Sequence, residues 1–517
     1  MKRNKIIQNN HIKFSEGQKK RNPQLFQKGC LSLLPFIFSA LLFCSGWPIK
    51  GLAESTLQKK PELLHAPNTP SGKFLLLTDN SMQSNDEKIS LVQAYEHMLL
   101  NNPKIYAAQA ARDIGLDEKN IARAGLLPKI SINYIRNRTQ RKEYIEQPGL
   151  LPSLPDRNYT IQDQFFGKRV GLNVEQVLFD YSAISTYRMG VTQAKYAEVE
   201  YRLQLQQQAI SLIDAYLNAV LARELLILTQ YQLRIYENTL HDNKKILAQG
   251  EGTQIDVLET RTQLDTTHAQ VIVYENELAN KMQELSMLLG EQVNPSQLMS
   301  IDLASDNVFL HTINKKKLLD DALQQNPEIQ AARLIIHYNE LSIEREKGQF
   351  MPRVSLFASH EKIDSDNINN KGRNYTSDTI GMQISIPIFN GGGNYYSTRQ
   401  AYNQREKARH ELYDKKNDTS LFIEKYYQVC STSMQRIHML RQNVINSSNL
   451  ARALRKSVIG GERTNSDVLN AENQIYQSQQ ALLHSVIELL QAYSKMQFYA
   501  GRFSEEDILT LNSKMIM

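Results

Sequence analysis

The sequence predicts a membrane protein of mixed helices and strands, built from two tandem copies of one helix-strand-strand-helix unit. Three observations indicate this class: motifs recur in one order at nearly constant spacing, short segments alternate apolar and polar residues, and four long segments lack proline. Alternation with a period of two gives a strand one apolar face, whereas apolar residues at helical spacing give a helix an apolar stripe. Such strands are typical of membrane β-barrels, and narrow stripes along very long helices are typical of coiled coils.

Composition excludes several other classes. The 517 residues are 41% hydrophobic and 22% charged, which excludes wholesale disorder, and only three are cysteine, which excludes a disulfide-rich scaffold. Beyond residue 53 no run of about 18 consecutive apolar residues occurs, which excludes a helical membrane protein. Only Cys430 lies beyond that point, so the mature chain is expected to form no intrachain disulfide.

The N-terminal leader holds the excess positive charge. The net charge is +6, but residues 1–53 contain nine of the 60 Lys and Arg and one of the 54 acids, so the remainder has a net charge of −2. Nucleic-acid binding needs a basic folded surface, so no nucleic-acid partner is expected. The apolar run Leu31–Cys44 precedes Gly51-Leu52-Ala53, which predicts a signal peptide over 1–53 and then a polar N-terminal segment over 54–87. The alternative is an uncleaved anchor helix, although the run is shorter than the ~20 residues that a span needs.

The internal repeat sets the domain boundaries. Four motifs recur in the same order, at offsets between 210 and 224 residues. The pairs are Asn102-Pro103 and Asn326-Pro327, Leu127-Pro128 and Met351-Pro352, Leu178-Phe179-Asp180 and Ile388-Phe389-Asn390, and Gly250–Leu258 and Gly461–Leu469. A period this long indicates two copies of one large unit, since short-repeat solenoids have periods of about 20–50 residues. We expect copy one over 88–312, copy two over 313–503 and a C-terminal tail over 504–517.

Each copy is expected to begin with helical segments interrupted at the Asn-Pro pair, because proline disfavours helix at the residue before it. Two strands and two long helices follow. The strands are expected near 128–139, 168–179, 352–361 and 378–389, and the long helices over 181–249, 254–289, 394–459 and 465–500. Ile380, Met382, Ile384, Ile386 and Ile388 give the strongest alternation in the chain.

Four strands are too few to close a useful barrel, and open strand edges are not tolerated in lipid. We therefore expect several identical chains to pool their strands. Three chains would supply a 12-stranded β-barrel, and their helices would form a long coiled-coil tunnel beneath it.

At this level of detail the chain resembles the TolC family of outer membrane channel proteins of Gram-negative bacteria, over about residues 88–508. The resemblance rests on the Asn-Pro helix starts and on the motifs Gln176-Val177-Leu178-Phe179-Asp180 and Pro387-Ile388-Phe389-Asn390-Gly391-Gly392. It implies a homotrimer in outer membrane lipid, with the helical tunnel extending into the periplasm. It also implies a periplasmic adaptor (membrane fusion) protein and an inner-membrane ABC or proton-driven transporter as partners.

Within that family, the stretch Gly461–Asn470 resembles the type I secretion branch. This resemblance favours the outer membrane exit duct of a tripartite type I protein secretion system. The alternative is the outer membrane component of a multidrug or small-molecule efflux pump. A structural periplasmic coiled-coil scaffold is a further alternative, but it leaves the alternating run Ile380–Ile388 unexplained.

The resemblance also implies a gate at the two helical hairpin tips. Arg463 matches a gate-locking arginine, Asp256 its partner across the helices, and Asp467 an acidic residue that three chains would arrange as a ring. Val458 and Asn470 depart from the family pattern, which expects a tyrosine and a second acid at these positions. The alternative interpretation is that both aspartates are first-turn acids, which the helix dipole favours regardless of function.

A second group of residues is expected at the junction between barrel and tunnel. Pro128, Pro352 and Pro387 suit strand ends, and Gly391 and Gly392 suit a sharp strand-to-helix turn.

Catalytic chemistry is not expected. Gly391-Gly392-Gly393 lacks the Lys-Ser/Thr of a phosphate loop, and Asp364-x-Asp366 fails the calcium-loop pattern at Ile368. The 11 histidines are scattered, without a metal-ligand motif. We therefore expect no enzyme, no cofactor and no metal site.

Overall fold

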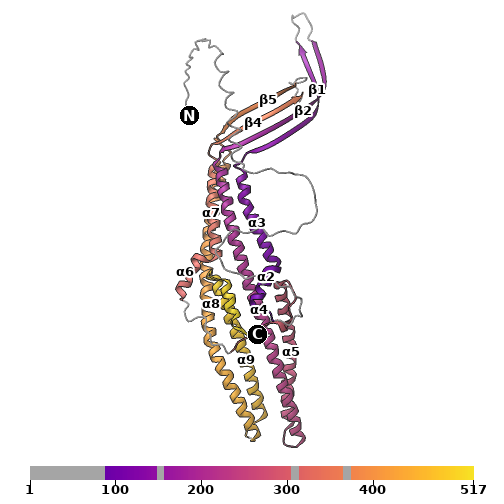
Figure 1. Cartoon of the computed structure of the whole chain (residues 1–517), viewed down its shortest axis with the longest axis vertical. Helices are drawn as coiled ribbons and strands as arrows, with labels where there is room; N and C mark the ends of the chain where they lie inside the picture. The colour runs from indigo at the N-terminus through magenta and orange to yellow at the C-terminus, as the bar shows by residue number, and fades with distance from the viewer. Residues whose placement is uncertain (1–87, 148–156, 304–313, 365–373, 461, 517) are drawn as a thin grey trace, which may run out of the picture. The chain divides into compact units, whose positions relative to one another are not determined.

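The computed structural model describes residues 88–147, 157–303, 314–364, 374–460 and 462–516 (Figure 1). The expected signal peptide over 1–53 and the polar segment over 54–87 lie outside these residues.

Both copies follow the same order of elements. Copy one consists of α2 Leu91–Asn101, α3 Pro103–Ala124, β1 Lys129–Gln147, β2 Arg157–Phe179, α4 Tyr181–Ala248 and α5 Gln254–Leu289. Copy two consists of α6 Lys315–Gln325, α7 Pro327–Gly348, β4 Arg353–Asp364, β5 Asn374–Ser385, α8 Gly393–Ile459 and α9 Asn465–Tyr499. Short elements follow the long helices of each copy, namely η1 Pro295–Gln297, β3 Ser300–Ile301, α10 Glu505–Asn512 and β6 Met515–Ile516.

The four long strands form one antiparallel sheet in the order β1-β2-β4-β5 (Figure 1). Directly paired residues share a face of a sheet. One face carries a mostly apolar surface, interrupted by Gln176, His360 and Asp378 and here called the apolar band: Ile130, Ile132, Tyr134, Val170, Leu172, Val174, Val354, Leu356, Ala358, Ile380, Met382 and Ile384. The opposite face is mostly small and polar, with residues such as Ser131, Asn133, Asn173, Ser359 and Thr379. β1 and β5 are the two edges of the sheet, and neither pairs with a further strand of the described residues.

The strand ends differ from the sequence expectation. β1 and β2 extend beyond the expected segments 128–139 and 168–179 into a polar stretch, where Thr and Tyr favour strand and the two strands pair out to Gln147 and Arg157. β5 has the expected length but lies four residues earlier than 378–389: it begins at Asn374 and ends at Ser385, the partner of Arg353. Pro352 and Pro387 flank this last pair of β4 and β5, and proline cannot donate the next ladder hydrogen bond. Ile386 and Ile388 therefore lie beyond the strand.

The C-terminal stretch is packed, whereas a tail was expected. α10 buries Ile508 and Leu511, and β6 pairs with β3 of the connection that follows copy one. The amphipathic segment is only eight residues long, too short for its periodicity to stand out in the sequence.

The helices pack around α4 and α8. α3 and α7 contact α4, α5 continues from α4 as a hairpin, and α9 contacts both α4 and α8 (Figure 1). The apolar positions of α4 that the sequence pairs at helical spacing are buried, including Leu212, Ile213, Tyr216 and Val220. Among the described residues, no helix combines the length and apolarity of a membrane span. Cys430 is buried within this helical core, which raises the pKa of its thiol to about 12.

The repeated Asn-Pro pair makes the same set of contacts in both copies, here called the Asn-Pro clamp. Asn102 caps α3 by accepting from the Lys104 amide (2.8 Å), and its side-chain amide donates to the Leu288 carbonyl at the end of α5 (3.0 Å). Asn326 likewise accepts from the Glu328 amide (2.8 Å) and donates to the Tyr499 carbonyl at the end of α9 (2.8 Å). Each asparagine thus fixes the start of one helix to the end of another.

Each clamp is completed by a left-handed glycine and an ion pair. Gly290 (φ 74°) packs on Asn101, and Gly501 (φ 71°) packs on the backbone of Asn326. The residue after each glycine forms an ion pair with the short helix of its copy. The pairs are Glu291 with His97 in copy one and Arg502 with Asp321 in copy two, so the charges are reversed between the copies.

Candidate functional site

The two hairpin tips use the same local structure. Thr253 and Asp256 form a capping box at the start of α5: the Thr253 hydroxyl accepts from the Asp256 amide (3.2 Å), and Asp256 accepts from the Thr253 amide (3.1 Å). Thr464 and Asp467 repeat this box at the start of α9, at 3.3 and 3.1 Å. Both expected gate acids therefore cap their own helices in the single chain.

Asp467 is held in its charged form by these contacts. Hydrogen bonds from the Thr464 amide and hydroxyl, with a smaller contribution from the nearby Arg463 charge, hold the pKa of Asp467 below its ordinary value. Because the folded-state pKa is lowered, its contribution to stability is present at neutral pH and is lost as the pH falls through that lowered pKa.

The ion pairs of the described residues do not include one between Asp256 and Arg463. Arg463 is exposed on the second tip. The contact that joins the two hairpins near their tips is instead a hydrogen bond from Asn465 on α9 to the Thr260 hydroxyl on α5 (3.2 Å). Thr260 also accepts from Asn243 on α4 (2.9 Å), so one hydroxyl links three helices.

Further polar contacts between the hairpins were not anticipated from the sequence. Gln480 on α9 donates to the Tyr274 hydroxyl on α5 (3.0 Å), and Tyr476 shares a hydrogen bond with Thr229 on α4 (2.7 Å). Lys495 pairs with Asp214 on α4 (2.8 Å). Polar residues within the apolar stripes of these helices do suggest polar contacts. The sequence does not reveal which helix supplies the partner.

An ion pair holds the second hairpin together near its tip. In copy two, Arg455 on α8 forms an ion pair with the buried Glu472 on α9, near the tip. Val458 is half-buried at the end of α8 and Asn470 is exposed on α9. Both residues that depart from the family pattern therefore lie on the second hairpin, which α8 and α9 form.

The expected junction residues lie where sheet and helices meet. Pro128 and Pro352 immediately precede β1 and β4, and Pro387 lies in the extended segment after β5. Gly391 (φ 58°) and Gly392 (φ 80°) adopt the left-handed conformation before α8, which only glycine adopts readily.

The apolar band is exposed to an unusual degree for a sheet face. Ile132 is 75% exposed and Ile380 70%, while Phe389, just beyond β5, is 84% exposed. Contiguous apolar surface of this kind marks a contact with lipid or protein.

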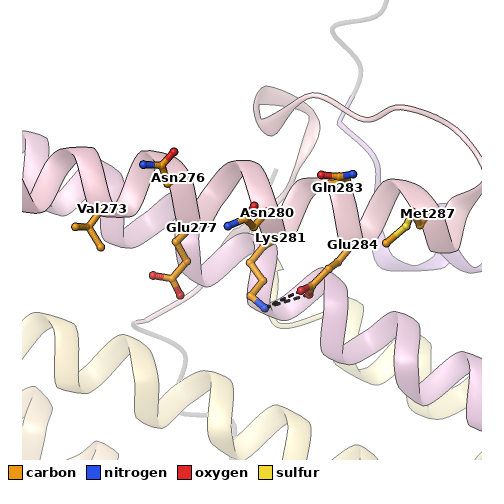
Figure 2. Close-up of a pocket in the computed structure, with 8 residues that line it drawn as sticks. All are labelled: Val273, Asn276, Glu277, Asn280, Lys281, Gln283, Glu284 and Met287. Atoms are coloured by element: carbon orange, nitrogen blue, oxygen red, sulfur yellow. Dashed lines mark hydrogen bonds and ion pairs between the residues drawn. The ribbon is translucent and has the colours of Figure 1, made fainter.

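A pocket-like hollow on α5 offers no catalytic arrangement. About 610 Å³ in volume, it lies along one face of α5, and Figure 2 shows Lys281 turned toward Glu284, with its ammonium 3.1 Å from the carboxylate. Its lining residues are Val273, Asn276, Glu277, Asn280, Lys281, Gln283, Glu284 and Met287. Within the described residues no group of three or more His, Cys, Asp and Glu could hold a metal ion.

Comparison with known proteins gives relatives that match more than four fifths of the chain. The chain is 31% identical over 445 residues to the alkaline protease secretion protein AprF of Pseudomonas aeruginosa, covering 84% of this chain and 89% of the relative. It is 30% identical over 429 residues to the proteases secretion protein PrtF of Dickeya chrysanthemi, covering 82% and 91%.

The fold is shared with solved outer membrane channels. The crystal structure of the Campylobacter jejuni CmeC outer membrane channel superposes with a TM-score of 0.68 at 16% identity, covering 88% of this chain and 98% of that one. The family model described as outer membrane efflux protein matches residues 94–291 and 318–502. The chain therefore belongs to the outer membrane efflux protein family, whose members are transport proteins of the outer membrane and not enzymes.

Proposed function

We propose that this chain is the outer membrane exit duct of a tripartite type I protein secretion system. The observation that carries the proposal is the similarity, over more than four fifths of the chain, to two proteins named for protease secretion. Family membership alone is compatible with efflux, whereas these two relatives specify protein export.

A homotrimer accounts for the unsatisfied edges of the sheet. β1 and β5 leave rows of backbone groups without strand partners among the described residues, and in lipid each unsatisfied group costs several kcal/mol. Joining β5 of one chain to β1 of the neighbouring chain, around a threefold axis, closes a 12-stranded barrel. The apolar band then faces acyl chains and the polar face lines an aqueous lumen.

The helices extend this lumen into the periplasm. There the duct meets a periplasmic adaptor protein, and through it an inner-membrane transporter that supplies the energy. The chain itself needs only to be a passive conduit that opens at its hairpin end.

Asp256, Arg463 and Asp467 form the gate in this proposal. Because Arg463 is exposed on one tip and Asp256 lies on the other, the pair is suited to contacts between neighbouring chains. Exposed pairs are each worth ~0.2–1 kcal/mol, so three of them form a latch that an adaptor can release. Three copies of Asp467 form a carboxylate ring, which attracts cations and repels anions.

Secretion by a strain that lacks its own exit duct tests the main proposal. A Pseudomonas aeruginosa strain without AprF but with the rest of its alkaline protease secretion machinery should release protease into the medium when it expresses this chain. Protease retained in the cells, despite correct outer membrane insertion of this chain, would contradict the proposal.

Single-channel recordings in planar bilayers test the gate. Arg463→Ala and Asp256→Ala should each raise the conductance, and Asp467→Asn should weaken block by multivalent cations. Glu251→Ala, at the first tip but outside the proposed pairs, is the matched control. Unchanged conductance in both Arg463→Ala and Asp256→Ala would remove these residues from the gate.

Small-molecule efflux remains the second candidate, and the family description favours it. Restored drug resistance in an efflux-deficient strain, without protease release, would support it. A structural scaffold predicts neither activity and predicts a protein that is soluble without detergent.

A further inference from the structure

The polar margin of the apolar band carries positive charge that the proposed channel does not use. Arg136 on β1 lies directly opposite Lys168 on β2, on the same face as the band. Lys362 on β4 lies opposite Val170, one row nearer the band, and Arg138 lies one row further away. These four exposed residues are here called the basic rim.

Charged side chains on both faces of the sheet find partners. On the polar face, Arg141 pairs with Glu143 and Arg353 with Glu175 (3.2 Å), and on the band face His360 contacts Asp378 (2.5 Å). In the described part of the chain, no ion pair involves a residue of the basic rim. Asp364 lies opposite Lys168 in the register and leaves the rim with an excess of positive charge.

Like charges directly opposite one another destabilise a sheet. Arg136 and Lys168 form such a pair, and an anion placed between them would convert repulsion into two charge-assisted hydrogen bonds. The aromatic rings of Tyr134 and Phe166 flank this pair, and the Arg138 guanidinium lies 5.9 Å from the Phe166 ring centroid. Aromatic and basic residues together are typical of the interface between acyl chains and headgroups.

We propose that the basic rim binds phosphate groups of lipid headgroups in the membrane leaflet remote from the helices. The inference rests on the proposed function, which places the apolar band against acyl chains. The rim then lies at the depth of the headgroups, because it follows the band directly along β1, β2 and β4, on the side away from the helices (Figure 1). Basic clusters beside a membrane-spanning surface attract anionic lipid in proportion to their charge.

Binding of lipid A to the purified, detergent-solubilised protein tests this proposal. Native mass spectrometry should show bound lipid A that carries two phosphates, and much less of the form with both phosphates removed. The double variant Arg136→Gln/Lys168→Gln should weaken binding about thirtyfold, because each basic side chain near the membrane surface contributes about 1 kcal/mol to binding of anionic lipid. The matched control Arg141→Gln/Lys142→Gln removes two positive charges from the same hairpin and should leave binding unchanged.

Three results would each overturn the proposal: equal binding of the dephosphorylated lipid, equal weakening by the control variant, or inorganic phosphate at the same concentration displacing the lipid. The last would identify a site for a free anion. Conductance of the wild-type protein is recorded in parallel. If the wild-type protein conducts but does not bind phosphorylated lipid, only the proposed role of the basic rim is refuted. If it neither conducts nor supports secretion, the proposed function is refuted.

Discussion

The Asn-Pro clamps of copy one and copy two share a backbone and differ in charge. Both use an asparagine that caps one helix and donates to the end of another, followed across the contact by a left-handed glycine. The ion pair beside it is Glu291 with His97 in copy one, but Arg502 with Asp321 in copy two. The comparison teaches that the positions with special backbone demands retain their residue types, whereas an ion pair can reverse its sign without altering the fold.

Glycine substitutions should have the largest effect on this comparison. A Cβ atom at Gly501 would lie 2.5 Å from the Asn326 amide nitrogen, whereas at Gly290 the nearest atom is the Asn101 Cβ at 2.8 Å. Gly501→Ala should therefore destabilise the protein by about 3 kcal/mol and Gly290→Ala by about 2 kcal/mol, through left-handed strain plus overpacking. Thermal unfolding in detergent, followed by circular dichroism, measures both. Equal losses would mean that the two clamps are equally tight.

Substitution of the asparagines should come next. Asn102→Ala and Asn326→Ala each remove a helix cap and one hydrogen bond, so each should cost about 2 kcal/mol. Asn→Ser at the same positions keeps a capping oxygen without adding charge and loses the donated hydrogen bond, so it should cost roughly half as much. The same melting experiment checks this order. A serine as damaging as the alanine would show that the cap contributes little.

Reversing the copy-two ion pair should have a smaller effect. Arg502→Glu places two acids together and should cost about 1 kcal/mol, while Arg502→Glu/Asp321→Arg should recover most of that loss. A double-mutant cycle on unfolding free energies measures the coupling. If the double variant recovers no stability, copy two accepts the ion pair only with the base at residue 502 and the acid at residue 321.

Exchanging the copy-one pair for the charges of copy two should have the smallest effect, below about 0.5 kcal/mol, because both side chains are partly exposed. His97→Asp/Glu291→Arg keeps one acid and one base in contact and reverses their positions. Thermal unfolding in detergent measures the change. A larger loss would show that copy one accepts only its own order of charges.

Much of this architecture follows from local signals in the sequence. Asn102-Pro103 and Asn326-Pro327 mark helix starts because proline suits the first helical position, and Thr253 and Thr464 mark two more through their capping aspartates. The alternation from Ile380 to Ile384 likewise predicts β5.

What escaped prediction depends on contacts between distant segments. The reversed ion pairs were invisible to a search for repeated residues, because His97 and Asp321 are chemically unlike. The extension of β1 was missed because its outer half alternates between polar residues, and only the partner strand β2 stabilises it. The link from Asn465 to Thr260 depends on how the two hairpins pack, which no single helix encodes.

The exposed apolar band has a consequence for biogenesis. On its way to the outer membrane a newly exported chain crosses an aqueous compartment, where Ile132 and Ile380 are uncovered and both edge strands of the sheet are open. Such a surface aggregates readily. Transport without aggregation therefore requires a chaperone that binds the exposed isoleucines and releases them only at the site of membrane insertion.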